Sequence, residues 1–555
     1  MENVFIEKIR KFKDITPNKI AFSYLERGLI KDSITYKEVY NKYVEYTEYL
    51  KKLKLENKLY VLYLSAGVDF VPILFSCIKN NIKVVIKTIG ETVSSEKLIY
   101  QLTELKSDIK DIEGIITNFD YNSFEEKCID MNLNYINITK KYNNIKYNPT
   151  KSNIKEELII LTSGSTKSSK GVLIDSRGLE LNVKECINFW NITDKDICLN
   201  WMPHSHIYGL VTGFLMPIYS GSTSFIMSPK EYSNDFDLFF TCLSKYKITH
   251  THTPASNMFL EKGYDFLKNN QDEKFTLKNL RAVSLGGEGI KYDLLEKFYS
   301  LAKKFEFKKI AFSPNYGMSE ITGLLCAIKS DEELCVVDIN ELFLKDSNIK
   351  NTPNNLISVG KVDDKVIICE PNTFNKLESL KVGEIIINVP SIASGYINCL
   401  EDNESFVKYN GKRCFRTGDL GFLYNGYLII TGRIKELIKI SGKNISPYEL
   451  ENIIVSNSNL EFIKSVVVFG KRNIEDYIEE IGVFIEVDDN KKLNVNELKK
   501  IIIRSVNDKL QIKIKKENIL ILRKNKIPRF SNGKVSRKKC NELFDIFKED
   551  ENEKG

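Results

Sequence analysis

One segment in the first third of the chain combines small hydroxyl residues, two glycines and two lysines directly behind an apolar run. It covers residues 162–172 and reads Thr-Ser-Gly-Ser-Thr-Lys-Ser-Ser-Lys-Gly-Val. Backbone N–H groups and hydroxyls of such small residues approach phosphate oxygens closely, and a lysine adds positive charge. The spacing differs from that of a P-loop nucleotidase, because Gly164 and Gly171 lie too far apart and Val172 follows. We therefore predict a phosphate-binding loop of another type, with a solvent-exposed turn as the alternative.

Two later segments carry groups suited to a nucleotide base and a metal ion. Residues 284–289 contain consecutive glycines after an apolar run, so a flat ring can lie against their backbone. Residues 314–320 place Tyr316, a surface for stacking on a base, four residues before Glu320, an oxygen ligand for Mg²⁺. Taken singly, a Gly-Gly-Glu turn and a core tyrosine explain these segments equally well.

Two more segments, nearer the C-terminus, also carry groups suited to binding a nucleotide. Residues 416–419 and 432–436 supply a carboxylate and a cation that suit ribose hydroxyls. Residues 528–534 place one lysine on a glycine-containing loop. An aspartate that caps a turn and a solvated lysine are the alternatives for these segments.

The composition is that of an ordinary globular protein. The chain has 555 residues, of which 42% are hydrophobic and 28% charged, enough for about three to four domain-sized units. Its net charge of +7 comes from 81 basic and 74 acidic residues spread along the chain, without the dense basic run typical of nucleic-acid binding. Nucleic acid is therefore not an expected partner.

Cysteine usage and the apolar segments bear on the compartment. The eleven cysteines occur singly, and the first residues lack the apolar core of a signal peptide. Residues 197–229 contain no charged side chain, but their continuous apolar part is far shorter than the roughly 20 residues that span a membrane. We predict a cytoplasmic protein without a transmembrane segment, with a buried helix and then a strand at residues 223–227.

Strand-like apolar runs alternate with amphipathic helical patterns over the first part of the chain, which predicts an α/β fold. The predicted strands are residues 59–64, 83–87, 157–161, 223–227, 281–285 and 309–312, and the predicted helices include residues 68–79 and 290–304. Shorter strands follow at residues 365–369, 383–389 and 427–431, and then helices at 447–455 and 494–509 with strands at 463–469 and 481–486.

These patterns predict three regions. Residues 1–433 form a large N-terminal domain of two αβ-layered subdomains plus a small β subdomain. Residues 434–547 form a compact α+β C-terminal domain. Residues 548–555 form a charged, disordered tail.

The order of these segments resembles the adenylate-forming superfamily, which contains acyl-CoA synthetases, nonribosomal peptide adenylation domains and luciferases. Within it, the chain is most similar to fatty acyl-AMP ligases. The similarity rests on Asn-Trp-Met-Pro at residues 200–203, Phe-Ile-Met-Ser-Pro at 225–229 and Phe-Ser-Pro-Asn-Tyr-Gly at 312–317. Residues 324–358 are also similar to an insertion of that branch, which is thought to hinder the rearrangement needed for CoA thioesterification.

The resemblance implies ATP-dependent activation of a fatty or other lipophilic carboxylic acid to acyl-AMP, with release of pyrophosphate. Transfer to the phosphopantetheine thiol of a separate acyl carrier protein would follow. His-Ile-Tyr-Gly at residues 206–209 favours the alternative, an acyl-CoA or aryl-CoA synthetase, whereas the insertion opposes it. Lys167 and Ser169 replace a glycine and a proline of the usual loop and are the only hints of a third alternative, a nucleotide-binding protein without catalysis.

By this resemblance, Lys534 would reach both the carboxylate and the α-phosphate, and His206 would lie at the acyl entrance. Thr166 and Glu320 would help to place Mg²⁺, and Lys435 would occupy the hinge position. The residues assigned to ATP are Thr162, Ser163, Gly164, Ser165, Thr166, Lys170, Gly286, Gly287, Glu288, Asn315, Tyr316, Gly317, Met318, Asp419, Arg433 and Lys435.

All four histidines fall in two His-x-His pairs, His204 with His206 and His250 with His252. Strand spacing would put each pair on one face, as a zinc site needs. The resemblance places the first pair at the acyl entrance and the second on a pocket-lining strand, where a polar or packed histidine suffices. We favour the packed histidines, with zinc as the alternative.

Overall fold

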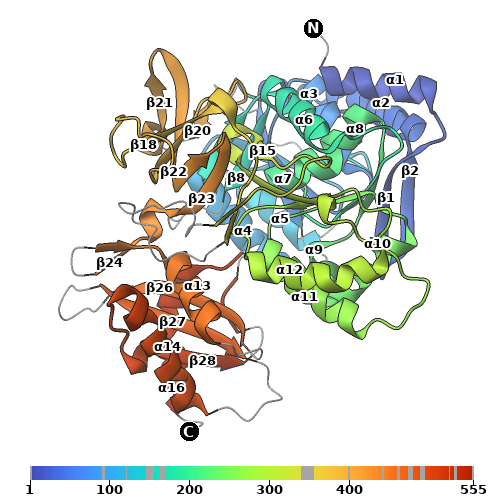
Figure 1. Ribbon diagram of the computed structural model, residues 1–555. Helices are drawn as coiled ribbons and strands as arrows, with labels where there is room; N and C mark the ends of the chain where they lie inside the picture. Colours follow the sequence, from blue (N-terminus) through green and yellow to red (C-terminus); the bar gives the residue numbers. More distant parts are fainter. Residues whose placement is uncertain are drawn as a thin grey trace.

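The elements of the computed structural model gather in a larger part, from α1 to β23, and a smaller part, from β24 to α16, shown in orange to red at the lower left of Figure 1. The residues that the structure describes are 3–89, 94–119, 122–144, 155–162, 170–338, 355–397, 401–440, 443–458, 463–472, 479–487, 494–523, 526–529 and 534–552.

One eight-stranded sheet is parallel in its centre and has antiparallel pairs at both edges. In order across the sheet, its strands are β15 (Gly323–Ala327), β14 (Phe312–Met318), β13 (Ala282–Leu285), β12 (His250–Thr253), β10 (Ile197–Asn200), β11 (Thr223–Ile226), β1 (Ile20–Glu26) and β2 (Leu29–Thr35).

A second eight-stranded sheet has the same plan. Its strands are, in order, β20 (Gly395–Tyr396), β9 (Lys170–Ile174), β8 (Leu158–Thr162), β4 (Lys83–Ile89), β3 (Leu59–Ser65), β5 (Ile112–Thr117), β6 (Asn134–Asn137) and β7 (Tyr142–Asn144).

Helices cover these sheets on both faces, which explains the uninterrupted apolar runs of the central strands. Tyr60, Leu62 and Leu64 of β3 face a core shared with the first sheet, whereas alternate residues such as Val61 and Tyr63 face a second core. The helices of this part are α1 (Val4–Ile15), α2 (Tyr36–Lys52), α3 (Phe70–Lys79), α4 (Ser95–Asp108), α5 (Asn122–Asp130), α6 (Ser176–Trp190), α7 (Ile207–Gly209), the π-helical turn η1 (Leu210–Leu215), α8 (Met216–Ser220), α9 (Pro229–Asn234), α10 (Phe236–Lys245), α11 (Ser256–Asn269) and α12 (Tyr292–Ala302).

A five-stranded antiparallel sheet follows, as the short strand patterns predict. It consists of β18 (Val366–Cys369), β19 (Gly383–Ile387), β22 (Lys412–Tyr424), β21 (Phe406–Tyr409) and β23 (Tyr427–Arg433). Within the predicted insertion, β16 (Val336–Asp338) and β17 (Asn355–Ile357) pair with each other, and residues 339–354 lie outside the described residues. Val337 packs against Phe422 and Ile429, which attaches the insertion to β22 and β23.

The smaller part has a three-stranded sheet with helices against it and its own apolar cores. Its elements are β24 (Ile438–Ile440), β25 (Lys443–Ile445), α13 (Pro447–Ser458), β26 (Ile463–Arg472), β27 (Glu479–Val487), α14 (Val495–Leu510), β28 (Ile519–Arg523), α15 (Arg537–Glu542) and α16 (Phe544–Asn552).

Two expectations from the sequence are wrong. Residues 309–312 are not a strand, because Lys309–Ala311 form a 3₁₀ turn with Ile310 exposed, and β14 begins only at Phe312. Residues 548–552 are not a disordered tail but the end of α16, since Phe544 stacks on Phe484 and anchors this charged helix. Among the described residues, no helix combines the length and apolarity needed to cross a bilayer.

Candidate active site

A cavity of about 1820 Å³ opens where parallel strands of both eight-stranded sheets end. Thr162 is the last residue of β8, Pro254 follows β12, and Gly287 lies just beyond β13. The carboxyl ends of parallel strands are where open α/β sheets bind ligands. Residues of the smaller part, among them Arg529 and Lys534, complete the wall.

Most of the predicted site residues in the described part of the chain line this cavity. They are Thr162, Lys170, His206, Gly287, Glu288, Asn315, Tyr316, Gly317, Met318, Glu320, Asp419, Arg433, Lys435 and Lys534. Gly286 lies directly behind the wall, where an added Cβ would come within 2.4 Å of Asn315 Oδ1. Residues 163–169 of the predicted phosphate loop lie outside the described residues, and they include Ser163, Gly164, Ser165 and Thr166 of the residues assigned to ATP.

Asp419 connects two of the groups predicted to contact the nucleoside. The Tyr316 hydroxyl donates to Asp419 Oδ2 at 2.5 Å, and Arg433 Nε donates to Asp419 Oδ1 at 2.5 Å. Asp419 and Arg433 face each other in the register of β22 and β23. The carboxylate of Asp419 raises the pKa of Arg433 further above its already high value, so the guanidinium stays charged.

Glu320 lies in the cavity wall on the short turn after β14. Its Oε1 accepts a hydrogen bond from the Tyr396 hydroxyl at 2.7 Å, and Lys170 Nζ lies 5.2 Å from the centre of the Tyr396 ring. Burial raises the pKa of Glu320, and the Tyr396 hydroxyl acts in the opposite direction. Sequence reasoning missed Tyr396. This residue lies on the two-residue strand β20, formed by the Gly-Tyr pair at residues 395–396.

Lys534 reaches into the cavity from the smaller part. A Cβ built at Gly287 would lie 2.9 Å from Lys534 Nζ, so the ammonium packs on the glycine backbone. Burial and the nearby Arg433 lower the pKa of Lys534, whereas the carboxylates of Glu288 and Asp419 act in the opposite direction. Lys534 thus brings a half-buried cation from the smaller part of the protein to the cavity wall.

His206 lies close enough to Lys534 for the charge of the ammonium to affect the protonation of the imidazole. Burial and the Lys534 ammonium lower the pKa of His206 to about 3, so the ring is neutral near pH 7. Its Nδ1 accepts a hydrogen bond from the Tyr208 N–H at 3.2 Å, so the ring proton resides on Nε2. His206 therefore offers one N–H donor to a bound anion.

The predicted residue Asn315 belongs to a buried hydrogen-bond network that sequence reasoning missed. Asn315 Nδ2 donates to Ser284 Oγ at 2.8 Å and to the Tyr208 hydroxyl at 3.2 Å, and Tyr208 and Ser284 are bonded to each other. These contacts hold Asn315 and Tyr208 in the wall, and no periodicity in the sequence predicts them.

The close approach of Lys534 to Gly287 predicts a mutational effect. Gly287→Ala should lower the adenylation rate at least tenfold, because Gly287 has φ +79° and a Cβ would lie 2.4 Å from Pro254 O and 2.5 Å from Lys534 Cε. The matched control is Gly289→Ala, whose Cβ would meet only Tyr448 at 3.9 Å. Steady-state rates of both variants check this, and equal rates would contradict the packing described.

Burial of Glu449 on α13 predicts a pH-dependent stability. It is 7% exposed, and burial raises its pKa to about 7 from the ordinary 4.5. Between these values the folded protein holds a proton that the unfolded chain loses, so stability falls as pH rises from about 4.5 to 7 and stays low above. Glu449→Gln should therefore raise the free energy of unfolding at pH 8 by up to about 3 kcal/mol. The melting temperature of this variant should be higher than that of the unmodified protein at pH 8 and nearly equal to it at pH 4.5.

Thermal melts at both pH values check this prediction. Glu517→Gln, a change at an exposed carboxylate of the same part, serves as the control and should show no such difference between pH 4.5 and 8. A Glu449→Gln variant that melts like the unmodified protein at pH 8 would contradict it.

Comparison with known proteins identifies the class to which this site belongs. The family model described as AMP-binding enzyme matches residues 10–397, and the model of the AMP-binding enzyme C-terminal domain matches residues 435–547. This chain therefore belongs to the AMP-binding enzyme family. The family assignment and the α/β fold agree with the expectation from the sequence.

Three relatives illustrate the range of similarity. The chain is 28% identical to the medium-chain-fatty-acid–[acyl-carrier-protein] ligase JamA of Moorena producens, over 94% of this chain and 92% of JamA. It is 26% identical to the long-chain-fatty-acid–AMP ligase FadD32 of Mycobacterium marinum, over 52% of this chain and 50% of FadD32. A solved structure from a study of fatty acyl-adenylate ligases from E. coli and L. pneumophila superposes with a TM-score of 0.80 at 20% identity, covering 98% of this chain and 99% of that chain.

Proposed function

We propose that this enzyme converts a fatty or other lipophilic carboxylic acid and ATP to acyl-AMP and pyrophosphate, and then transfers the acyl group to a separate holo acyl carrier protein. The observation that carries the proposal is the position of Lys534 in a cavity that also holds Tyr316, Glu320, Asp419 and Arg433. The substrates in the names of JamA and FadD32, a medium-chain acid with a carrier protein and a long-chain acid with AMP, support the acid class.

The chemistry demands charge neutralisation more than covalent participation of the protein. Attack of a carboxylate oxygen on the α-phosphorus brings two anions together, forms a P–O bond and expels pyrophosphate in line. Lys534 would neutralise the charge that gathers on the carboxylate and the α-phosphate in the transition state. His206 would donate its Nε2–H to the carboxylate or phosphate, since its ring is neutral.

The remaining residues would hold the nucleotide. Asp419 would accept the ribose hydroxyls beside Arg433, and Tyr316 with Gly287 would bracket adenine. The loop from Thr162 to Lys170 would bind the β- and γ-phosphates. Mg²⁺, which would neutralise phosphate charge, fits Glu320, a half-buried carboxylate in the cavity wall, together with Thr166.

We further propose that residues 434–547 form a mobile C-terminal domain that turns about Lys435. Lys435 lies in the 3₁₀ turn Ile434–Glu436, directly after β23, and lines the cavity. A turn about this point would remove Lys534 after the first half-reaction and admit the carrier thiol, which attacks the acyl carbon and releases AMP. The cytoplasmic location stays a prediction.

The proposed enzyme and the alternative, a CoA ligase, differ in the thiol that accepts the acyl group. Attachment of β16 and β17 to β22 and β23 supports an insertion that restrains the rearrangement, which favours a carrier protein over CoA. The residue types at Ile207 and Tyr208 are similar to those of acyl- and aryl-CoA ligases at this point, which favours the alternative, a CoA ligase.

Exchange of radiolabelled pyrophosphate into ATP, across a panel of acids, tests the first half-reaction. Exchange should depend on a lipophilic acid and on Mg²⁺, with fatty acids at least tenfold more active than amino acids. No exchange with any acid would leave a nucleotide-binding protein without catalysis and would refute the proposal.

A further inference from the structure

Three potential metal ligands converge on one face of the first eight-stranded sheet, away from the cavity lining. Cys198 of β10 and His250 of β12 are paired in register, and His252 lies two residues further along β12 on the same face. The ligand atoms of Cys198, His250 and His252 all lie within 4.8 Å of one another, and each of the three residues is 0% exposed. Sequence spacing gives the histidine pair, but only the sheet register adds the cysteine.

The imidazole nitrogens of this cluster lack the partners that buried polar atoms normally have. Within the described part of the chain, His250 Nε2 and both nitrogens of His252 have no hydrogen-bond partner. In the described residues, the thiol of Cys198 makes a long contact, 4.0 Å, with Thr212 O and has the Ser224 hydroxyl as a second polar neighbour. An unsatisfied buried donor or acceptor costs about 1–3 kcal/mol, so several in one place need a ligand to explain them.

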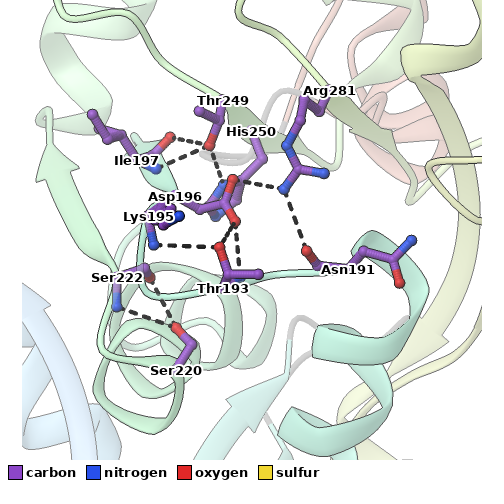
Figure 2. Close-up of polar contacts among 10 residues, drawn as sticks. All are labelled: Asn191, Thr193, Lys195, Asp196, Ile197, Ser220, Ser222, Thr249, His250 and Arg281. Carbon is purple, nitrogen blue, oxygen red and sulfur yellow. Dashed lines mark hydrogen bonds and ion pairs between the residues drawn. The ribbon is translucent and has the colours of Figure 1, made fainter.

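Hydrogen bonds around His250 fix which of its nitrogens has a free lone pair. Thr249 Oγ1 donates to Ile197 O at 3.1 Å and accepts from the Ile197 N–H at 2.9 Å, as Figure 2 shows. When the threonine proton goes to Ile197 O, His250 Nδ1 is the donor in its 3.2 Å contact with Thr249 Oγ1. Nε2 of the neutral ring then carries the lone pair that a metal requires, and the Nδ1 bond orients the ring, as in known metal sites.

We propose that Cys198 Sγ, His250 Nε2 and one nitrogen of His252 bind a zinc ion. Thiolate and imidazole are the ligands that zinc prefers, and binding would release the thiol proton of Cys198. Ligand atoms of a tetrahedral centre lie about 3.3–3.8 Å apart, so the side chains need only small rotations from their present positions. Ser224, which pairs with Cys198 on β11 and whose buried Oγ lies near the Cys198 thiol, is placed to hydrogen-bond a water at the fourth position.

The location assigns this zinc a structural role. None of the three ligands lines the cavity, but the His252 ring lies 5.9 Å from that of Tyr208, which does. The ion would join β10 to β12 and support the floor that positions Tyr208 and, through it, Asn315. It takes no part in the proposed adenylation chemistry, so its test stands apart from the proposed function.

The test is the zinc content of the full-length protein after reconstitution with zinc and removal of free metal. One zinc per chain is expected, falling at least tenfold in Cys198→Ser and in His252→Gln. Two matched controls should keep the metal: Cys186→Ser, another fully buried cysteine, and His204→Gln, a buried histidine that also has an unpartnered Nε2 but stacks on Phe70.

Cobalt substitution gives a second readout that does not require the variants to fold. The unmodified protein should show the thiolate-to-cobalt charge-transfer band and visible bands of a tetrahedral centre. Less than 0.1 zinc per chain with no cobalt band would overturn the proposal, and so would zinc that all four variants retain. A protein that adenylates normally but binds less than 0.1 zinc per chain after reconstitution would overturn the site and leave the proposed function intact.

Discussion

Lys534→Ala is expected to lower the rate of acyl-AMP formation by about 10²–10³-fold or more while the protein stays folded. Lys534 supplies a half-buried cation near Glu288, Asp419 and the neutral His206, where water screens charge less than at the open surface. Burial already disfavours its charged form, so removal of the ammonium relieves a desolvation cost instead of leaving a gap in an apolar core. Pyrophosphate exchange with a fatty acid, together with a thermal melt, measures both effects.

The control for Lys534 is Lys526→Ala, which removes an exposed lysine from the same C-terminal region. Its adenylation rate should equal that of the unmodified protein. An acyl-AMP yield from Lys534→Ala that is close to normal would mean that another cation does this work, and the assignment of the site would fail.

Glu320→Gln is expected to lower the adenylation rate about 10²-fold and to raise the Mg²⁺ concentration needed for half-maximal rate. Glutamine keeps the size of the side chain and still accepts the hydrogen bond from Tyr396, so the wall stays in place. What is lost is the negative charge that a hard cation requires of an oxygen ligand. A magnesium titration of the initial rate gives both numbers.

Glu332→Gln is a close control for this change. Glu332 also accepts a hydrogen bond from a tyrosine hydroxyl, that of Tyr427, but it does not line the cavity. It should leave the magnesium dependence unchanged. If Glu320→Gln behaves in the same way, Glu320 is a structural partner of Tyr396 and the metal is held elsewhere.

The fold was predictable wherever burial on two faces leaves an apolar run. β3 is an example, because Leu59 to Leu64 alternate between two cores and thus show no polar face at all. The start of β14 was not predictable in this way, since Ile310, Ala311 and Phe312 form one short apolar run that is compatible with a turn or a strand. Likewise, the charges of residues 548–552 concealed a helix, because its anchor, Phe544, lies earlier in the chain.

The site was predictable where one short segment carries the chemistry and unpredictable where distant segments meet. Tyr316 and Glu320 are four residues apart, and both line the cavity. Tyr396 comes 76 residues after its partner Glu320, and Lys534 reaches Gly287 from the far end of the chain. Such contacts depend on sheet order and on packing between the two parts, which local spacing does not encode.

The most direct test of the proposed function is mass spectrometry of the products when CoA and a holo carrier protein compete. ATP, Mg²⁺ and a mixed pool of fatty acids would be supplied with both thiols at equal concentration. Acyl-AMP and acyl-carrier protein, with acyl-CoA at least tenfold less abundant, is the result we predict, and the loaded chain would name the preferred acid. Abundant acyl-CoA would contradict a carrier-specific enzyme and show that the segment with β16 and β17 does not prevent thioesterification of CoA.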